Sequence, residues 1–157
     1  MMKYILKLVT LVSLLSFVGC ASLPTSQEMR DDIVGFELPQ LPQEGKAMVY
    51  VVRPAMLGKL IRFKVFLDNK EAESKMGHTR GKQYIYFEIE PGSHQILSKA
   101  ENTAEVNLNA EAGDIFFIQQ EPQMGLFSAR NSVMEIPDYQ GKYHVKHLKL
   151  GKIYKDK

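Results

Sequence analysis

Alternation of hydrophobic and polar residues predicts a series of short β-strands between residues 46 and 136 of this 157-residue chain. The alternation is cleanest over residues 103–110, where alanine, valine and leucine occupy one face and glutamate and asparagine the other. Turn-forming residues such as Pro91-Gly92 and Gly113 separate the hydrophobic segments about every ten residues. The predicted strands are residues 47–53, 62–68, 83–89, 93–99, 103–110, 115–119 and 131–136.

No long helical pattern separates these strands, so parallel βαβ units are not expected. The pattern therefore favours an all-β fold, an antiparallel β-sandwich of about seven short strands, with a small barrel as the alternative. Val106 and Leu108 are expected to flank the core, because residues two apart in a strand share a face. After the last strand, Asp138 is a suitable helix cap, and we expect a short C-terminal helix over residues 138–149.

The first 20 residues have the pattern of a secretory signal. Lys3 and Lys7 give a positive start, and small residues follow the apolar stretch that ends at Val18. This stretch begins at Tyr4 and is shorter than the ~20 residues of a membrane-spanning helix. An uncut N-terminal membrane anchor is the alternative interpretation.

The one cysteine of the chain stands where the apolar stretch ends. Phe17-Val18-Gly19-Cys20-Ala21 resembles the lipobox of bacterial lipoproteins, although Phe17 replaces the usual leucine. The resemblance implies that residues 1–19 are a signal peptide and that Cys20 is acylated and becomes the first mature residue. Acyl chains would anchor the protein in a membrane. Ala21, which is not aspartate, implies a lipoprotein of the outer membrane that faces the periplasm.

Residues 20–45 have little periodic pattern and include Pro24, Pro39 and Pro42. We expect most of this segment to be a lipidated tether, and residues 46–157 to be the β-sandwich domain with a basic C-terminal segment. Loss of the signal would remove two lysines and no acid, which leaves the mature chain neutral. A neutral net charge gives no indication of nucleic-acid binding. A single cysteine also excludes an internal disulfide and a cysteine-rich zinc site.

Several short segments of the body resemble the DUF2846 family of bacterial lipoproteins. The segments that carry the resemblance are 20–24, 47–54, 65–68, 84–87, 90–94 and 110–114. The turn from Pro91 to His94 is also similar to that of PEGA surface domains, which are immunoglobulin-like sandwiches. Asn69 and Lys70 stand where the family usually has a glycine. The resemblance implies an envelope location and a β-sandwich, and it implies no catalytic residue.

Two basic segments are candidate anion-binding sites. The first is a glycine-containing loop between two predicted strands, which could bind carboxylates or phosphates through side chains and backbone. Its candidate residues are Lys75, His78, Arg80 and Lys82. The second is the lysine-rich C-terminal segment, which could attract anionic lipid headgroups or cell-wall carboxylates. Its candidate residues are Lys146, Lys149, Lys152 and Lys155. A solvated loop and a solvated tail are the alternatives.

Other polar residues give weaker signals. His94 is expected to stabilise its turn, and His144 and His147 have a helical spacing but lack the glutamate of a zinc-protease motif. Tyr50, Tyr84 and Tyr86 could line one outward face and bind glycans, unless a second layer covers them. No nucleophile motif occurs, so we expect no catalytic residue, metal or other cofactor.

These observations predict a lipid-anchored lipoprotein of the cell envelope that acts as a non-catalytic binding or interaction module. Its expected partners are the membrane, through the lipid, and the cell wall, anionic lipid or another envelope protein. One alternative is an envelope hydrolase acting on cell-wall or glycan material, for which Glu88 and Glu90 could form a carboxylate pair. The other alternative is a structural linker between the membrane and the cell wall.

Overall fold

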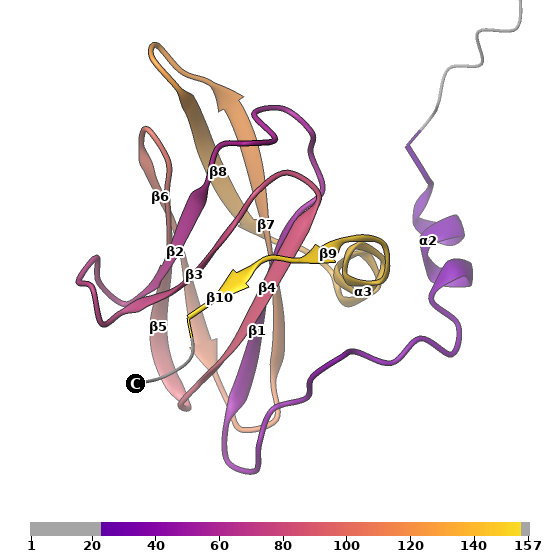
Figure 1. Ribbon diagram of the computed structural model, residues 1–157. Helices are drawn as coiled ribbons and strands as arrows, with labels where there is room; N and C mark the ends of the chain where they lie inside the picture. The colour runs from indigo at the N-terminus through magenta and orange to yellow at the C-terminus, as the bar shows by residue number, and fades with distance from the viewer. Residues whose placement is uncertain (1–22, 155–157) are drawn as a thin grey trace, which may run out of the picture.

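The computed structural model describes residues 23–154. Two five-stranded sheets pack face to face, and two short helices lie on one side (Figure 1). The strand order is β8-β7-β1-β4-β9 in the first sheet, sheet A, and β10-β3-β2-β5-β6 in the second, sheet B. The predicted sandwich and the predicted C-terminal helix are confirmed.

The element bounds follow the predicted strands closely over most of the body. The strands are β1 (Ala47–Arg53), β2 (Phe63–Leu67), β3 (Lys75–Thr79), β4 (Gln83–Ile89), β5 (Gly92–Lys99), β6 (Thr103–Ala110), β7 (Ile115–Met124), β8 (Ala129–Glu135), β9 (Lys149–Leu150) and β10 (Lys152–Ile153). The helices are α2 (Ser26–Asp32) and α3 (Asp138–His147). Within sheet A, the β1–β7 and β4–β9 pairings are parallel, and the other pairings in the molecule are antiparallel.

The main core fills the space between the two sheets. Val49 and Val51 from sheet A pack against Val65 and Ile96 from sheet B, and all four are buried. Leu108 is 5% exposed and belongs to this core, and Val106 packs against it from a partly buried position. The expected placement of these two residues is therefore confirmed.

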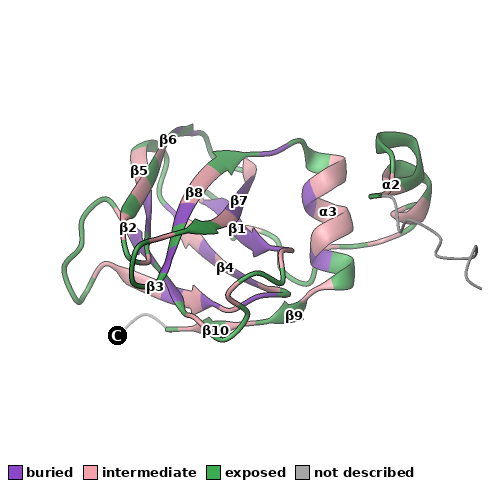
Figure 2. Ribbon diagram, turned by 90° about the horizontal axis from the view of Figure 1, so that it is seen from above, coloured by how far each residue is buried: buried purple, intermediate pink, exposed green. Residues whose placement is uncertain are grey.

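A third layer covers the outer face of sheet A (Figure 2). There Tyr50, Tyr84 and Phe117 form a second buried cluster with Val145 of α3, and Phe36 of the N-terminal segment packs against it. The alternative of a covering layer is therefore confirmed for Tyr50 and Tyr84, because the helix and the N-terminal segment cover them, and Tyr86 packs against the same cluster from a partly buried position. Burial on both faces also explains why every residue of β1 is buried.

Two glycines allow the C-terminal elements to pack closely against the rest of the fold. A Cβ atom added at Gly141 of α3 would overlap the ring of Phe117, so glycine lets the helix lie directly on sheet A. The helix ends at His147, because Leu148 is extended and the chain then pairs with β4. The next residues pair with β3, so β9 and β10 connect the neighbouring edges of the two sheets. Gly77 permits this approach, since a Cβ atom there would overlap the carbonyl of Lys152.

The segment before the sandwich is folded against α3. Helix α2 begins with a capping box formed by Thr25 and Glu28. The guanidinium of Arg30 lies 3.8 Å from the ring centre of Tyr139 in α3. The carboxylate of Asp32 lies 3.2 Å from the Lys146 ammonium and 2.8 Å from Nε2 of His147.

The predicted signal peptide, residues 1–19, and the predicted acylation site, Cys20, lie outside the described residues. Between residues 23 and 154, neither helix has the length and apolar character needed to cross a membrane.

Candidate functional site: a basic face on sheet B

The strand register of sheet B places four basic side chains in one row on its outer surface. Lys99 of β5 lies opposite Lys64 of β2, Lys64 lies opposite His78 of β3, and His78 lies opposite Lys152 of β10. The three lysines are exposed, and His78 is partly buried. Like charges placed directly opposite one another destabilise a sheet. Sheet stability therefore gives no reason for this row.

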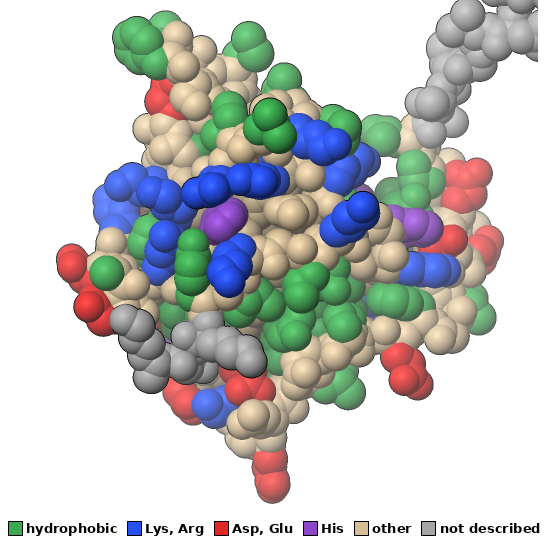
Figure 3. All heavy atoms as spheres, in the orientation of Figure 1, with side chains coloured by type: hydrophobic (Ala, Val, Ile, Leu, Met, Phe, Trp, Pro, Cys, Tyr) green, Lys and Arg blue, Asp and Glu red, His purple; other side chains and the backbone are tan. Residues whose placement is uncertain are grey.

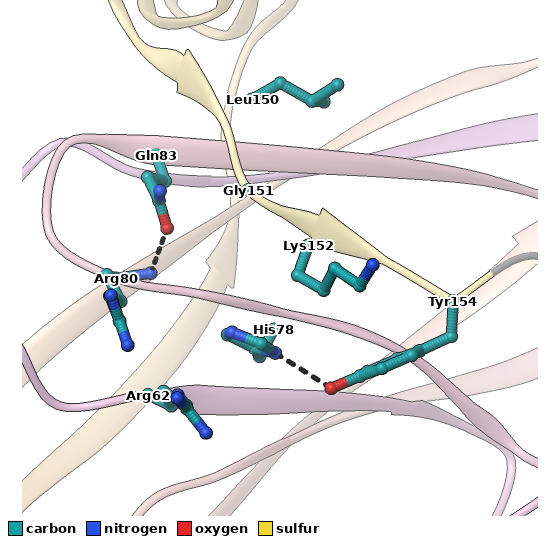
Figure 4. A pocket seen from close by; sticks show the side chains of 8 residues that line it. All are labelled: Arg62, His78, Arg80, Gln83, Leu150, Gly151, Lys152 and Tyr154. Atoms are coloured by element: carbon teal, nitrogen blue, oxygen red, sulfur yellow. Dashed lines mark hydrogen bonds between the residues drawn. The ribbon is translucent and has the colours of Figure 1, made fainter.

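Two arginines enlarge the row at the ends of β2 and β3. Arg62 and Arg80 line a shallow pocket of about 450 Å³ together with His78, Lys152 and Tyr154 (Figure 4). The backbone N–H of Arg80 donates a hydrogen bond of 2.8 Å to the side chain of Gln83, which also lines the pocket. Nε of Arg80 is buried and has no hydrogen-bond partner among the described residues.

We call the six residues Arg62, Lys64, His78, Arg80, Lys99 and Lys152 the basic face. Figure 3 shows lysine and arginine side chains gathered on this side of the molecule, with acidic side chains toward its margins.

His78 lies at the centre of the basic face. Its Nδ1 is 3.0 Å from the hydroxyl oxygen of Tyr154, which reaches back from the residue after β10 (Figure 4). Partial burial lowers the pKa of His78, and the nearby positive charges of Arg62, Arg80, Lys75 and Lys152 lower it further. The imidazole is therefore neutral at pH 7, and the charge of the face comes from lysine and arginine.

The positive charges of the basic face are not neutralised by neighbouring acids. Within the part of the chain that the structure describes, no carboxylate lies within 4.0 Å of its lysines or arginines. Three other lysines do have acidic partners: Lys46 pairs with Glu88 and Glu90, Lys142 with Asp138, and Lys146 with Asp32. The basic face is thus free to bind an anionic partner.

The structure brings together part of each predicted anion-binding segment. Lys75, His78 and Arg80 of the first segment meet Lys152 of the second, and the ammonium of Lys75 lies 4.6 Å from the ring centre of Tyr154. Residues 75–79 of the first segment form the strand β3, so the expectation of a loop is wrong for them, whereas Arg80 and Lys82 lie in the turn before β4. Pairing with β2 on one side and β10 on the other makes residues 75–79 a strand.

The other predicted anion-binding residues lie elsewhere. Lys82 has a positive φ of 63° and lines a different pocket, beside His144. Lys146 forms an ion pair with Asp32, and Lys149 lies on β9 at the edge of sheet A. Lys155 lies outside the described residues. The expected single group of C-terminal lysines is therefore divided among three elements, because the segment forms a helix end and two strands.

Sequence reasoning missed Arg62, Lys64 and Lys99. All three are charged residues at the polar positions or ends of predicted strands, which is the ordinary pattern of a solvated sheet face. Their importance depends on which strands are neighbours, and no local signal contains that information.

The remaining candidates have structural roles. Burial disfavours the charged form of His94, but hydrogen bonds to Asp68 and to the carbonyl of Glu90 outweigh this effect and raise its pKa. His94 thus stabilises its turn, as expected.

The two histidines of α3 line the same pocket but have different surroundings. Burial, with the nearby charge of Lys82, lowers the pKa of His144 to about 4. His147 contacts Asp32 instead. Among residues 23–154, no three potential ligands form a metal-binding group.

Comparison with known proteins places this chain in a family. Residues 43–134 match the family described as "Protein of unknown function (DUF2846)", and the match covers more than half of the chain. The chain belongs to the DUF2846 family. It is also 24% identical over 110 residues to a protein named "Uncharacterized protein" from Haemophilus influenzae (strain ATCC 51907 / DSM 11121 / KW20 / Rd).

The alignment to that relative covers 69% of this chain and 63% of the relative, so it spans less than two thirds of the relative's length. The region that matches DUF2846 contains five residues of the basic face, whereas Lys152 and its neighbour Tyr154 lie beyond it.

Proposed function

We propose that this DUF2846 protein is a lipid-anchored lipoprotein of the cell envelope, on the outer membrane, and acts as a non-catalytic binding module. Its basic face binds an extended polyanion that carries carboxylate or phosphate groups. The observation that carries this proposal is the row of Lys99, Lys64, His78 and Lys152, which lacks neighbouring carboxylates among the described residues. A bound polyanion would remove the mutual repulsion within the row.

The shape of the basic face favours a long or flat ligand. Neighbouring strands lie about 4.8 Å apart, so a row across four strands extends for about 14 Å. The pocket beside the row is shallow and open along the surface, unlike the enclosed clefts that bind small molecules. Arg62 and Arg80 add planar guanidinium groups, which bind carboxylates and phosphates through paired hydrogen bonds.

The surroundings of Glu88 and Glu90, the candidate carboxylate pair of a hydrolase, favour a binding module over an enzyme. Lys46 lies between Glu88 and Glu90, 4.0 Å from one carboxylate and 3.3 Å from the other. Both carboxylates contact the same ammonium group, so they form a surface salt bridge and not a free acid–base pair.

The anchoring part of the proposal depends on Cys20. The cysteine thiol would form the thioether to the lipid, and removal of residues 1–19 would leave it at the new N-terminus. The Cys20→Ser variant should then remain unprocessed or become soluble. Separation of membranes from soluble proteins tests this, and a processed Cys20→Ser protein that stays with membranes would contradict lipid anchoring.

Binding to polyanions tests the basic face. The purified mature protein should bind polyphosphate, polyglutamate or isolated cell-wall sacculi, with an affinity that falls as salt rises. The double variant Lys64→Gln/Lys152→Gln should lose most of this binding. The control Lys70→Gln/Lys142→Gln removes the same charge from the β2–β3 loop and α3, and it should bind as the wild type does. Equal losses in both variants, or no binding by the wild type, would refute the proposal.

A further inference from the structure

One end of the sandwich exposes large apolar side chains from two loops. The β1–β2 loop and the β7–β8 turn lie at the same end, and the hairpin of β7 and β8 projects beyond it (Figure 1). Leu60 is 79% exposed, Leu126 is 86% exposed and Phe127 is 96% exposed. We call this surface the apolar end, which consists of Met56, Leu57, Leu60, Met124, Leu126 and Phe127. Soluble monomers seldom leave so many large apolar side chains together in water.

A buried arginine holds the first loop in place. Arg53 at the end of β1 donates hydrogen bonds to the carbonyls of Leu57, Gly58 and Ile61, at 3.0, 2.9 and 2.7 Å. Its guanidinium also lies 3.6 Å from the ring centre of Phe63. These contacts fix the loop backbone, so the exposed leucines cannot turn inward without breaking them.

A carboxylate holds the second loop in the same way. Glu101, in the β5–β6 turn, accepts hydrogen bonds from the backbone N–H groups of Leu126, Phe127 and Ser128, at 3.2, 3.0 and 2.6 Å. The bonds from Phe127 and Ser128 contribute most to lowering the pKa of Glu101. The two loops are also in contact, since a Cβ atom at Gly58 would lie 3.3 Å from Cβ of Ala129. The apolar end is therefore one preformed surface.

The start of the described chain lies beside this end. Leu23 and Pro24 line a pocket of about 500 Å³ together with Met56 of the β1–β2 loop. Cys20 precedes Leu23 by three residues, which span at most about 10 Å. An acyl anchor on Cys20 would therefore keep the bilayer surface close to the apolar end, and the docking of α2 on α3 limits how far the body could move away.

Basic side chains accompany the apolar ones. Lys59 is exposed between Leu57 and Leu60 in the first loop, and Arg130 is exposed just after the second. Apolar side chains with lysine or arginine beside them suit a bilayer interface, where the former enter the acyl boundary and the latter face phosphate headgroups.

We propose that the apolar end is a membrane-contact surface, through which Leu60, Leu126 and Phe127 enter the interfacial layer of the bilayer that holds the acylated Cys20. The proposal rests on the proposed lipid anchor. In this orientation, the end of the sandwich that carries the β1–β2 loop and the β7–β8 turn faces the membrane. The basic face then lies on the flank of the sandwich, open to a polyanion beside the membrane.

Site-specific fluorescence on vesicles tests this orientation. A thioether on Cys20 blocks its thiol, so Phe127→Cys and Leu60→Cys each provide one labelling site for a polarity-sensitive fluorophore. Ala112→Cys, in the turn between β6 and β7 at the opposite end, is the matched control. The lipidated variants are reconstituted in vesicles of phosphatidylethanolamine and phosphatidylglycerol. At both sites of the apolar end, we expect a blue shift and quenching by brominated acyl chains, and neither change at residue 112.

A second form of the protein separates this proposal from lipid anchoring. The same probes are placed in a Cys20→Ser chain whose residues 1–19 are replaced by a hexahistidine tag, bound to vesicles through nickel-chelating lipids. If the lipidated protein does not float with vesicles, the anchor proposal fails, and the tagged chain still tests the contact. The membrane-contact proposal would be overturned if the probes at residues 60 and 127 showed no more blue shift or quenching than the probe at residue 112.

Discussion

Replacing Lys64 by glutamine should stabilise the protein, because this lysine stands at the centre of the basic row. It lies directly opposite Lys99 on one side and His78 on the other. With His78 neutral, the main repulsion removed is that with Lys99. Two exposed charges about 7 Å apart in water repel by about 0.6 kcal/mol, which agrees with the roughly 0.2–1 kcal/mol of cross-strand pairs. We therefore expect Lys64→Gln to raise the free energy of unfolding by about 0.5 kcal/mol at low salt.

Urea denaturation at two salt concentrations measures this effect. At about 0.01 M salt the screening length is about 30 Å and the gain should be complete, whereas at about 1 M it is about 3 Å and the gain should vanish. Lys70→Gln is the control, since Lys70 is exposed in the β2–β3 loop, outside the row. The same variant should bind polyanions more weakly, so stability and binding change in opposite directions. A Lys64→Gln protein that is less stable than the wild type at low salt would refute the repulsion argument.

Three further predictions concern the core, the N-terminal segment and the pH dependence of binding. Leu108→Ala should lower the free energy of unfolding by roughly 2–5 kcal/mol in a urea titration, because it leaves a cavity in the main core. Tyr50→Phe should lower it by about 1–3 kcal/mol, since the Tyr50 hydroxyl donates to the carbonyl of Gln40 at 2.5 Å and accepts from its N–H at 3.1 Å, and both bonds would be lost. Polyanion binding should tighten as pH falls, because an anion raises the lowered pKa of His78 and binding then takes up a proton. Titrations over a range of pH should show this dependence in the wild type and a flatter one in His78→Gln, and an identical profile in both would exclude His78 as the titrating group.

Local pattern was sufficient for the strands with a clear alternation of side chains. The predicted bounds of 47–53, 83–89 and 103–110 are those of β1, β4 and β6. Alternation and flanking turns are properties of neighbouring residues, so they are visible without the fold. The same holds for Leu108, whose place in the core follows from its position on the apolar face of β6.

Strand β3 could not be predicted in this way. Its residues Gly77 and His78 have little preference for strands, and the segment is extended because β2 and β10 pair with it. The glycine has a clear role only once Lys152 lies against it, since the close backbone approach leaves no room for a side chain. The burial of Tyr50 likewise depends on α3 and the N-terminal segment, which come from distant parts of the chain.

The amino-acid sequence by itself determined the fold class, the bounds of the strands with a clear alternation and the presence of basic residues in two segments, because each of these depends on residues close together in the chain. The tertiary structure alone decided which basic residues form a site. Lys64, His78, Lys99 and Lys152 come from four strands, and only the order and register of sheet B place them opposite one another. That register results from burial of the opposite face of each strand in the common core. It depends on several segments together and cannot be inferred from any one of them.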